Sequence, residues 1–145
     1  MRAKSGLSFV RAMQSRGTNY PPIGKWVDLK IRAVRRGKIA VSGVPTEDHY
    51  NPLNVVHGGF ASTLMDLALG LVSITVLPNM QSGVSTTDLT VKYLRPIFKS
   101  TGRLICDAAV IYSGKRIVVA QARLRDSARK LYATAQSTCL VVPRR

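Results

Sequence analysis

One acidic residue stands in the most apolar stretch of the chain. The segment NPLNVVHGGFASTLMDLALG, residues 51–70, begins with turn-forming residues and then holds Asp66 among apolar side chains. A buried carboxylate is costly unless it is paired or used, and no Lys or Arg lies between residues 57 and 77. A hydrogen bond to Thr63 or to a loop backbone would explain it structurally. The functional interpretation is a general base or a nucleophile in a partly desolvated pocket.

The residues just before this acid could stabilise negative charge. The run 57–77 is long, lacks strand-like alternation and stops at Pro78, which predicts a buried helix. The first N–H groups of a helix have no intrahelical partner and lie at its positive end, and Gly58 and Gly59 leave them open to approach. The side-chain amide of Asn51 could point at the same oxygen, although turn formation is its alternative role. An oxyanion developing on a carbonyl would be stabilised there.

One face of the predicted helix carries a polar stripe. Gly59, Thr63, Asp66 and Gly70 are spaced four, three and four residues apart and therefore share a face. Gly59 and Thr63 are candidate substrate contacts on this stripe. For Gly70, close packing of the helix on a sheet is the favoured explanation.

His57 is expected to cap or orient the loop before the helix, with at most a minor part in ligand contact. A metal site is not expected, because His49 and His57 are the two histidines of the chain and no Cys or acid cluster has ligand spacing. His57 is therefore a candidate site residue and not a metal ligand.

The spacing within the helix limits what one chain can do. Gly58 and Asp66 are eight residues apart, or about 12 Å along a helix, and the lean of side chains toward the N-terminus recovers part of that distance. One carbonyl cannot readily touch both groups. Two antiparallel copies of the helix would bring Asp66 of one chain near Gly58 of the other, which predicts a dimer with two composite sites.

The rest of the chain predicts an antiparallel sheet. VDLKIRAV alternates, which places Val27, Leu29, Ile31 and Ala33 on one face of a half-buried strand. RRGK is a hairpin turn with Gly37 at its tip, and IAVSGV is the partner strand. Four further strands are expected after the helix, at about 84–94, 102–112, 117–126 and 130–142. A curved sheet wrapped round the apolar helix gives an α+β domain.

Length and composition fit one folded domain of 145 residues. We expect a basic N-terminal segment over residues 1–19, with a short helix in it, and a single domain over residues 20–145. No acid precedes Asp28, and residues 1–19 hold four cations, so an organelle transit peptide is the alternative for this segment: Arg2, Lys4, Arg11 and Arg16. The longest uncharged apolar stretch, residues 67–77, is too short to span a bilayer.

Charge and cysteine content narrow the partners. Cys106 and Cys139 are too few for a disulfide framework and lie in strand-like runs, which favours buried, reduced thiols and a cytoplasmic location. The formal net charge of +15 is spread along the chain without interleaved aromatic residues. Nucleic acid is therefore not the expected partner, whereas a phosphate-bearing small molecule fits the charge.

Together these motifs resemble the hotdog-fold acyl-CoA thioesterases, in particular the PaaI-like group associated with phenylacetate catabolism. The resemblance covers about Tyr20 to Val142. It rests on the Asn, His-Gly-Gly and Asp of HYNPLNVVHGGFASTLMDLALG, on STTDLTVKYLRPI, and on GRLICDAAVIYSGKRIVVAQARLRD. It implies a hotdog fold, in which a curved antiparallel sheet of five to six strands wraps round one long buried helix, and a homodimer or homotetramer.

The resemblance also implies catalytic roles. Asn51 and the Gly58 amide would polarise the thioester carbonyl, while Asp66 of the other chain would activate water or attack directly. Thr86, where the family places a small hydroxyl residue, would hydrogen-bond Asp66 or the water. The alternative for Thr86 is an ordinary strand threonine.

Coenzyme A would give the basic surface a ligand. The candidates for contact with its phosphates are Arg95 in YLRP and Lys115 and Arg116 in SGKR. For each of them a solvated surface charge is the alternative.

The resulting prediction is a homo-oligomeric acyl-CoA thioesterase that needs no metal or redox cofactor, since coenzyme A is part of the substrate. The acyl group would be aromatic, such as a phenylacetyl type, or of medium length. A non-catalytic acyl-CoA-binding regulator, in its sharper form one that contacts nucleic acid, is the alternative. No dehydratase pattern is visible, because that chemistry would need an acid and a His acting as a pair.

Overall fold

The chain forms one antiparallel sheet and one long apolar helix, as its alternating segments and its long apolar run predict. The computed structural model describes residues 4–16 and 21–145, so Arg2 and Tyr20 lie outside the described residues. One antiparallel sheet has the strand order β1-β2-β4-β5-β6-β3. Its strands are β1 (Lys30–Arg35), β2 (Lys38–Gly43), β3 (Ser82–Tyr93), β4 (Leu104–Ser113), β5 (Ile117–Asp126) and β6 (Leu131–Pro143). The prediction of an α+β domain with a six-stranded antiparallel sheet is confirmed.

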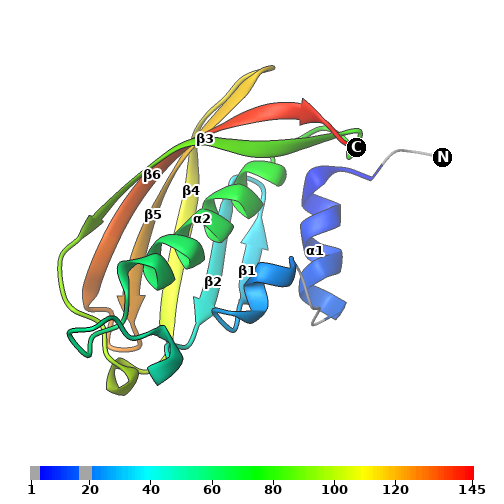
Figure 1. Cartoon of the computed structure of the whole chain (residues 1–145). Coiled ribbons are helices and arrows are strands. Elements are labelled where there is room, and N and C mark those ends of the chain that lie inside the picture. The colour runs from blue at the N-terminus through cyan, green and yellow to red at the C-terminus, as the bar shows by residue number, and fades with distance from the viewer. Residues whose placement is uncertain (1–3, 17–20) are drawn as a thin grey trace.

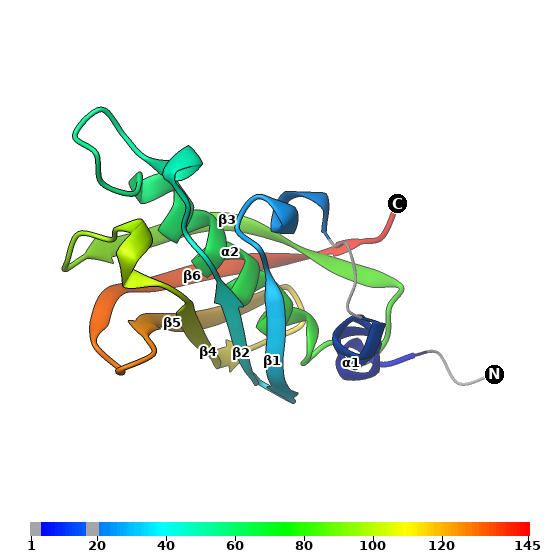
Figure 2. The same ribbon diagram turned by 90° about the horizontal axis from the view of Figure 1, so that it is seen from below.

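Helix α2 (Gly58–Ile74) lies across the inner face of the curved sheet (Figures 1 and 2). Its buried apolar side chains leave little of the helix uncovered, and they form the centre of the hydrophobic core: Phe60, Ala61, Leu64, Met65, Ala68, Leu69, Leu71 and Val72. The helix ends three residues before the predicted Leu77. The helix and the sheet therefore bury each other, as the apolar composition of residues 57–77 requires.

The β1–β2 turn is bonded to the end of α2. Gly37 has φ +74°, a left-handed conformation that favours glycine, and its N–H donates to the Thr75 hydroxyl at 2.9 Å. The Arg36 guanidinium donates to the Val76 carbonyl at 3.2 Å. Two hydrogen bonds thus tie the predicted hairpin to the two residues that follow α2.

The register predicted for the first strand is wrong at Ala33. The strand begins at Lys30, and a bulge between Ile31 and Ala33 shifts its pairing with β2. Ile31 pairs with Val41 and Val34 pairs with Ile39, so Ile31 and Val34 face the core while Ala33 is exposed on the outer face. One extra residue reverses the faces of the side chains that follow it.

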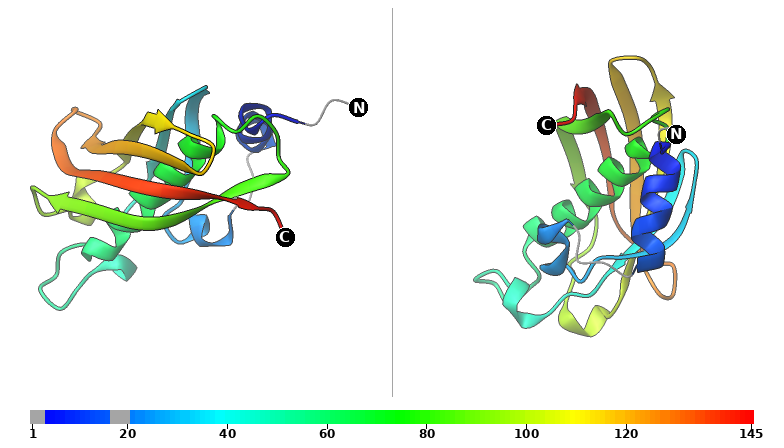
Figure 3. Two further views of the ribbon diagram at one scale, coloured as in Figure 1. Left: turned by 90° about the horizontal axis from the view of Figure 1, so that it is seen from above. Right: turned by 90° about the vertical axis from the view of Figure 1, so that its right-hand side faces the viewer.

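Helix α1 (Gly6–Arg16) lies beside β1, near the end of α2 (Figures 1 and 3). Val10 and Met13 are buried in the core, and the Gly6 N–H donates to the Leu77 carbonyl at 3.0 Å. The helix falls in the segment where a short helix was expected, and the division of the chain near residue 19 stays a prediction. Of the described helices, none is both long and apolar enough to cross a membrane.

Three short 3-10 turns complete the described chain, at Pro22–Lys25, Glu47–His49 and Lys99–Thr101. The last two lie at the end of the molecule where α2 begins (Figure 1). This end also carries the motif residues 51–58.

Gly43 offers a test of the packing between β2 and α2. A Cβ at this position would lie 2.7 Å from the Val27 carbonyl oxygen and 2.9 Å from Leu64 Cδ2. We expect Gly43→Ala to lower the free energy of unfolding by about 1–3 kcal/mol through overpacking, measured by denaturant titration. Gly83→Ala in β3 is the matched control, because a Cβ there would meet nothing within 4 Å. Equal losses in the two variants would contradict the packing.

Candidate functional site

The Asp66 carboxylate is held by the strand opposite its helix. Asp66 is half-buried on α2, and the Thr86 hydroxyl of β3 donates to its Oδ1 at 2.9 Å. Among residues 4–16 and 21–145, no Lys or Arg forms an ion pair with it. The hydrogen bond implied for Thr86 is therefore present, and it takes the place of the alternative bond to Thr63 or a loop. The catalytic role of this pair stays a prediction.

A β-bulge turns Thr86 toward Asp66. Thr86 pairs with the buried Cys139 of β6, and Leu89 pairs with the buried Ser137. Between these two pairs β3 advances by three residues and β6 by two, so β3 holds one extra residue, between Thr86 and Asp88. Without the extra residue, Thr86 and Leu89 would point to opposite faces of the sheet. Bulges that re-aim a side chain in this way are common beside active sites.

Two side chains secure the bulge against β6. The Thr87 hydroxyl donates to the Thr138 carbonyl at 3.0 Å, and Asp88 Oδ1 accepts from the Thr138 N–H at 3.0 Å. The sequence analysis missed this feature. The sequence does carry a signal for it. The apolar residues change from an even position at Val84 to an odd position at Leu89, which the regular alternation of a strand does not allow.

His57 caps α2 and leaves one of its first amides open. His57 is the N-cap residue, and its Nδ1 accepts from the Gly59 N–H at 2.8 Å. The predicted capping role is confirmed, and it occupies the Gly59 amide. In the described part of the chain, the Gly58 N–H makes no hydrogen bond. Gly58 therefore supplies the free donor at the positive end of the helix.

Asn51 has both a turn role and a free donor. Its Oδ1 accepts from the Leu53 N–H at 2.9 Å and from the Val55 N–H at 3.3 Å. The alternative role in turn formation is thus real, but it uses the side-chain oxygen alone. The amide nitrogen makes no hydrogen bond with any residue that the structure describes, so it can still donate to a substrate.

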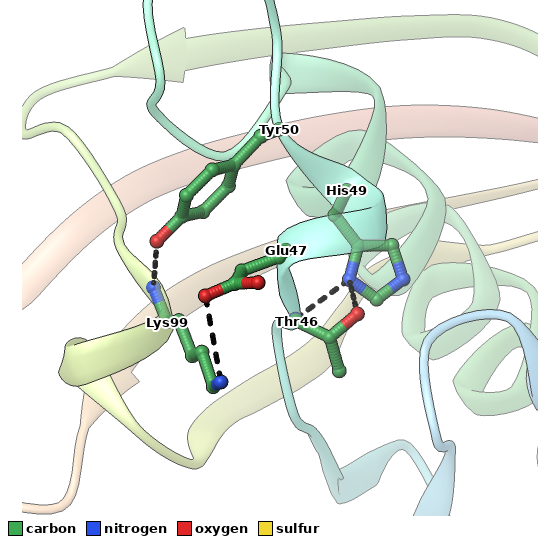
Figure 4. A network of polar contacts seen from close by, with 5 residues as sticks. All are labelled: Thr46, Glu47, His49, Tyr50 and Lys99. Atoms are coloured by element: carbon green, nitrogen blue, oxygen red, sulfur yellow. Dashed lines mark hydrogen bonds and ion pairs between the residues drawn. The ribbon is translucent and has the colours of Figure 1, made fainter.

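The loop that carries Asn51 is fixed by the side chains around it (Figure 4). Buried His49 accepts from the Thr46 N–H at its Nδ1, 2.8 Å away, and its Nε2 lies 2.6 Å from the Trp26 carbonyl. The Tyr50 hydroxyl accepts from the Lys99 N–H at 3.0 Å. The backbone carbonyl of His49 in turn accepts from the His57 N–H at 2.7 Å. These bonds tie the loop to the start of α2.

A groove of about 450 Å³ opens beside the first turn of α2. Its lining combines motif residues with the segment that follows β3: Val56, His57, Gly58, Ala61, Tyr93, Leu94, Arg95, Pro96 and Ile97. Arg95 therefore lies at the groove, as its candidate role requires. Asp66 does not line this groove, which agrees with its place two turns further along the helix.

Lys115 and Arg116 lie far from the groove of their own chain. Tyr93 pairs with Ala133 of β6, whereas Ile117, the residue after Arg116, pairs with Leu140. Ala133 and Leu140 are seven residues apart along β6, which is a distance of about 23 Å. One chain therefore brings Arg95, and not the other two cations, to Gly58.

The predicted polar stripe on α2 is present. Gly59, Thr63, Asp66 and Gly70 are all half-buried. The close-packing explanation for Gly70 is wrong, since a Cβ there would meet nothing within 4 Å. This side of α2 is thus open at Gly70, whereas at Asp66 it meets Thr86 of β3.

Neither cysteine is a candidate nucleophile. Cys106 and Cys139 are free thiols, and both are fully buried. Burial, followed by the neighbouring Asp107 carboxylate, raises the pKa of the Cys106 thiol well above its usual range. A thiol held in its protonated form is a poor nucleophile.

Comparison with known proteins places this geometry in a family. The Thioesterase superfamily model matches residues 53–133, which is more than half of the chain. The chain belongs to the Thioesterase superfamily. The match contains Gly58, Asp66 and Thr86, and Asn51 lies two residues before it. Membership in this superfamily supports a hydrolase.

Curated relatives of this superfamily member agree with the assignment. A protein from Halobacterium salinarum is 46% identical over 67 residues, which are 46% of this chain and 42% of that protein. A protein from Saccharolobus solfataricus is 27% identical over 113 residues, 78% of each chain. Both are named "Putative esterase". The chain thus matches less than half the length of the first relative.

Solved structures show that this thioesterase-superfamily chain has the hotdog fold. A phenylacetic acid degradation-related protein from Ralstonia eutropha JMP134 has a TM-score of 0.81 and 25% identity, covering 91% of this chain and 98% of that one. A thioesterase from Haemophilus influenzae has a TM-score of 0.79 and 22% identity, covering 92% and 90%. A Streptococcus mutans protein, solved with acetyl-CoA bound, has a TM-score of 0.72 and 23% identity, covering 81% and 90%.

Thr86→Val tests the contact that holds the carboxylate. The change keeps the shape of the side chain and removes its hydroxyl, so we expect the free energy of unfolding to fall by about 0.5–1.5 kcal/mol, the range for a typical hydrogen bond, because Thr86 is exposed to solvent. Denaturant titration measures the loss. Thr90→Val is the control, because Thr90 is exposed on the same strand and its hydroxyl makes no hydrogen bond within the described residues. Indistinguishable effects would contradict the Thr86–Asp66 bond.

Proposed function

We propose that this protein hydrolyses an acyl-CoA thioester to the free acid and coenzyme A. The observation that carries the proposal is the half-buried Asp66 carboxylate, which accepts from the Thr86 hydroxyl and has no cationic partner in the described part of the chain. The free donors of Gly58 and Asn51 supply the second half of a hydrolytic site. Superfamily membership supports the same reaction class.

In the proposed mechanism, the Gly58 N–H and the Asn51 amide donate to the thioester carbonyl oxygen. Asp66 takes a proton from water as the water oxygen forms a bond to the carbonyl carbon, or its carboxylate attacks that carbon directly. Negative charge then develops on the carbonyl oxygen, where the two donors are worth most. The C–S bond breaks as the carbonyl reforms, and the thiolate of coenzyme A leaves and takes up a proton. Where Asp66 itself has attacked, the acyl group stays on its carboxylate as a mixed anhydride, which water then hydrolyses to the free acid and the regenerated carboxylate.

The two halves would come from two chains. Edge strand β3 is twelve residues long, and within the described structure its outer edge is unpaired. Long open edges invite pairing with another chain. Pairing of two β3 strands about a two-fold axis would run the two α2 helices antiparallel, with their uncovered stripes toward each other. Asp66 of one protomer would then approach Gly58 of its partner, in a homodimer or a tetramer of two such dimers.

Coenzyme A fits the charge of the site. Arg95 lines the groove beside Gly58, and we propose that it contacts a phosphate of the substrate. Lys115 and Arg116 could take part only from the other protomer, because they lie about 23 Å along the sheet in the same chain. We also propose that the substrate contacts three residues at the start of α2 and on its polar stripe: His57, Gly59 and Thr63.

The acyl group is proposed to be aromatic, of the phenylacetyl type, or of medium length. The support comes from the Ralstonia eutropha relative, which is described as related to phenylacetic acid degradation, and from the apolar groove residues Val56, Leu94 and Ile97. The acetyl-CoA bound to the Streptococcus mutans protein supports coenzyme A as the carrier.

The proposed mechanism uses a carboxylate, a water molecule and amide donors, so it calls for no metal or redox cofactor. A cytoplasmic location is proposed with it. The support is the state of the two cysteines, which are free and buried.

A non-catalytic role in binding an anionic partner, either acyl-CoA or nucleic acid, is the second candidate. The observation that favours it is a groove of about 470 Å³ on the outer face of the sheet, lined by Arg35, Lys38 and Arg123 and by one acid, Asp107. Salt-sensitive retention on DNA without any turnover would support this candidate over the enzyme.

Asp66→Asn tests the enzyme directly. The amide still accepts from Thr86 but cannot take a proton, so we expect thiol release from a panel of aromatic and medium-chain acyl-CoAs to fall at least about 100-fold, with binding retained. Asp107→Asn is the control, because this acid is paired with Arg125 at 3.8 Å, away from α2. Full turnover by Asp66→Asn would refute the assigned role.

Mixed dimers test whether the site is composite. Asn51→Ala and Asp66→Asn should each be inactive, and refolding them together should restore about one quarter of wild-type activity, because half of the dimers are mixed and each mixed dimer has one intact site of two. Thiol release from the mixture measures the recovery. If one chain holds the whole site, the mixture will stay inactive.

A further inference from the structure

We propose that Tyr93 is a positioning residue that fixes the Gly58–Gly59 peptide and thereby aims the free Gly58 amide at the groove. Tyr93 is the last residue of β3, and its hydroxyl donates to the Gly58 carbonyl at 3.0 Å. The inference rests on the proposed function, because it concerns the donor that would hold the thioester oxygen.

The Gly58–Gly59 peptide is held at both of its ends. Tyr93 binds its carbonyl oxygen, and His57 Nδ1 accepts its N–H at 2.8 Å. Two bonds in opposite directions fix the plane of this peptide. The orientation of the preceding N–H, which is the free donor of Gly58, depends on that plane through the backbone torsions of Gly58.

Gly58 needs such a restraint. Glycine has the widest backbone freedom of any residue, and the first turn of a helix lacks half of the usual hydrogen bonds. Two consecutive glycines therefore start α2 at its least constrained point. A donor that stabilises an oxyanion is effective only when its direction is set before the reaction.

The Tyr93 ring fills the space that a side chain at residue 58 would occupy. A Cβ on Gly58 would lie 3.1 Å from Cζ, 3.2 Å from the hydroxyl oxygen and 3.3 Å from Cε1 of Tyr93. Because Gly58 has no side chain, the Tyr93 ring can lie against the helix backbone at this residue.

The base of Tyr93 is well anchored, so the ring can act as a fixed support. Tyr93 pairs with the fully buried Ala133, and the next residue, Leu94, donates its N–H to the Tyr132 carbonyl at 2.8 Å. The residue itself is 53% exposed. Tyr93 therefore adds little to the core, and its hydroxyl contact is with the groove end of α2.

Tyr93→Phe keeps the ring and removes the bond to Gly58. With an acyl-CoA that the wild-type protein hydrolyses, we expect kcat to fall about five-fold, as for the loss of one hydrogen bond, with KM within about two-fold and an unchanged melting temperature. Tyr112→Phe is the matched control, since Tyr112 is 56% exposed and lies at the far end of the sheet. An unchanged kcat in Tyr93→Phe, or an equal loss in the control, would overturn the proposal.

A double variant tests the fit between the ring and the glycine. Gly58→Ala places a methyl group against the ring and should lower the melting temperature. Adding Tyr93→Ser, which removes the ring, should restore part of that loss. A double variant that is no more stable than Gly58→Ala would mean that the ring does not lie against residue 58, and it would overturn the proposal.

A third measurement does not depend on turnover. If the wild-type protein releases no thiol from any acyl-CoA, the proposed function fails, but Tyr93 can still be judged by hydrogen exchange. We expect the Gly59 amide to exchange several-fold faster in Tyr93→Phe than in wild type, because the peptide that carries it has lost one of the two side-chain hydrogen bonds that hold it. Equal exchange rates would reject Tyr93 as the restraint, whatever the activity.

Discussion

The rise of α2 along its axis determines how the polar groups of this protein can cooperate. The free Gly58 amide opens the first turn and Asp66 follows two turns later, so the two lie about 12 Å apart along the helix. The structure keeps that separation. Gly58 lines a groove with Tyr93 at the end of β3, and Asp66 accepts a hydrogen bond from Thr86, nearer the start of β3. Each chain thus carries two halves, an open amide donor and an acid, that do not face each other.

The sheet positions both halves through one strand. β3 carries the bulge that turns Thr86 toward Asp66, and seven residues later it ends in the tyrosine that binds the Gly58 carbonyl. The register of β3 on β6 therefore controls the placement of the carboxylate and of the helix start together. A slip of one residue would move Thr86 to the outer face of the sheet, so the register of β3 on β6 decides whether Thr86 can bond to Asp66.

The sequence predicted the parts of this arrangement that depend on local periodicity. The helical pattern, the turn at Gly37 and the capping by His57 all follow from neighbouring residues. Bulges did not follow, because one inserted residue reverses every later side chain, as at Ala33. Contacts across long separations also escaped: nothing in the sequence links Tyr93 to Gly58, which are thirty-five residues apart. The change of parity between Val84 and Leu89 was readable and would have revealed the second bulge.

Gly70 marks a place where its own chain leaves α2 uncovered. The lack of a side chain at Gly70 was expected to allow close packing of the helix on the sheet, yet the space beside this residue is open. The same side of the helix carries Thr63 and Asp66, both half-buried, and Asp66 bonds to β3, whose outer edge is unpaired within the described residues. A helix this apolar is stable when it is covered all round, and here the cover is incomplete along the polar stripe, most clearly beside Gly70. A second copy, brought in by pairing at β3, would cover that stripe and would face its acid with the donors of another helix start.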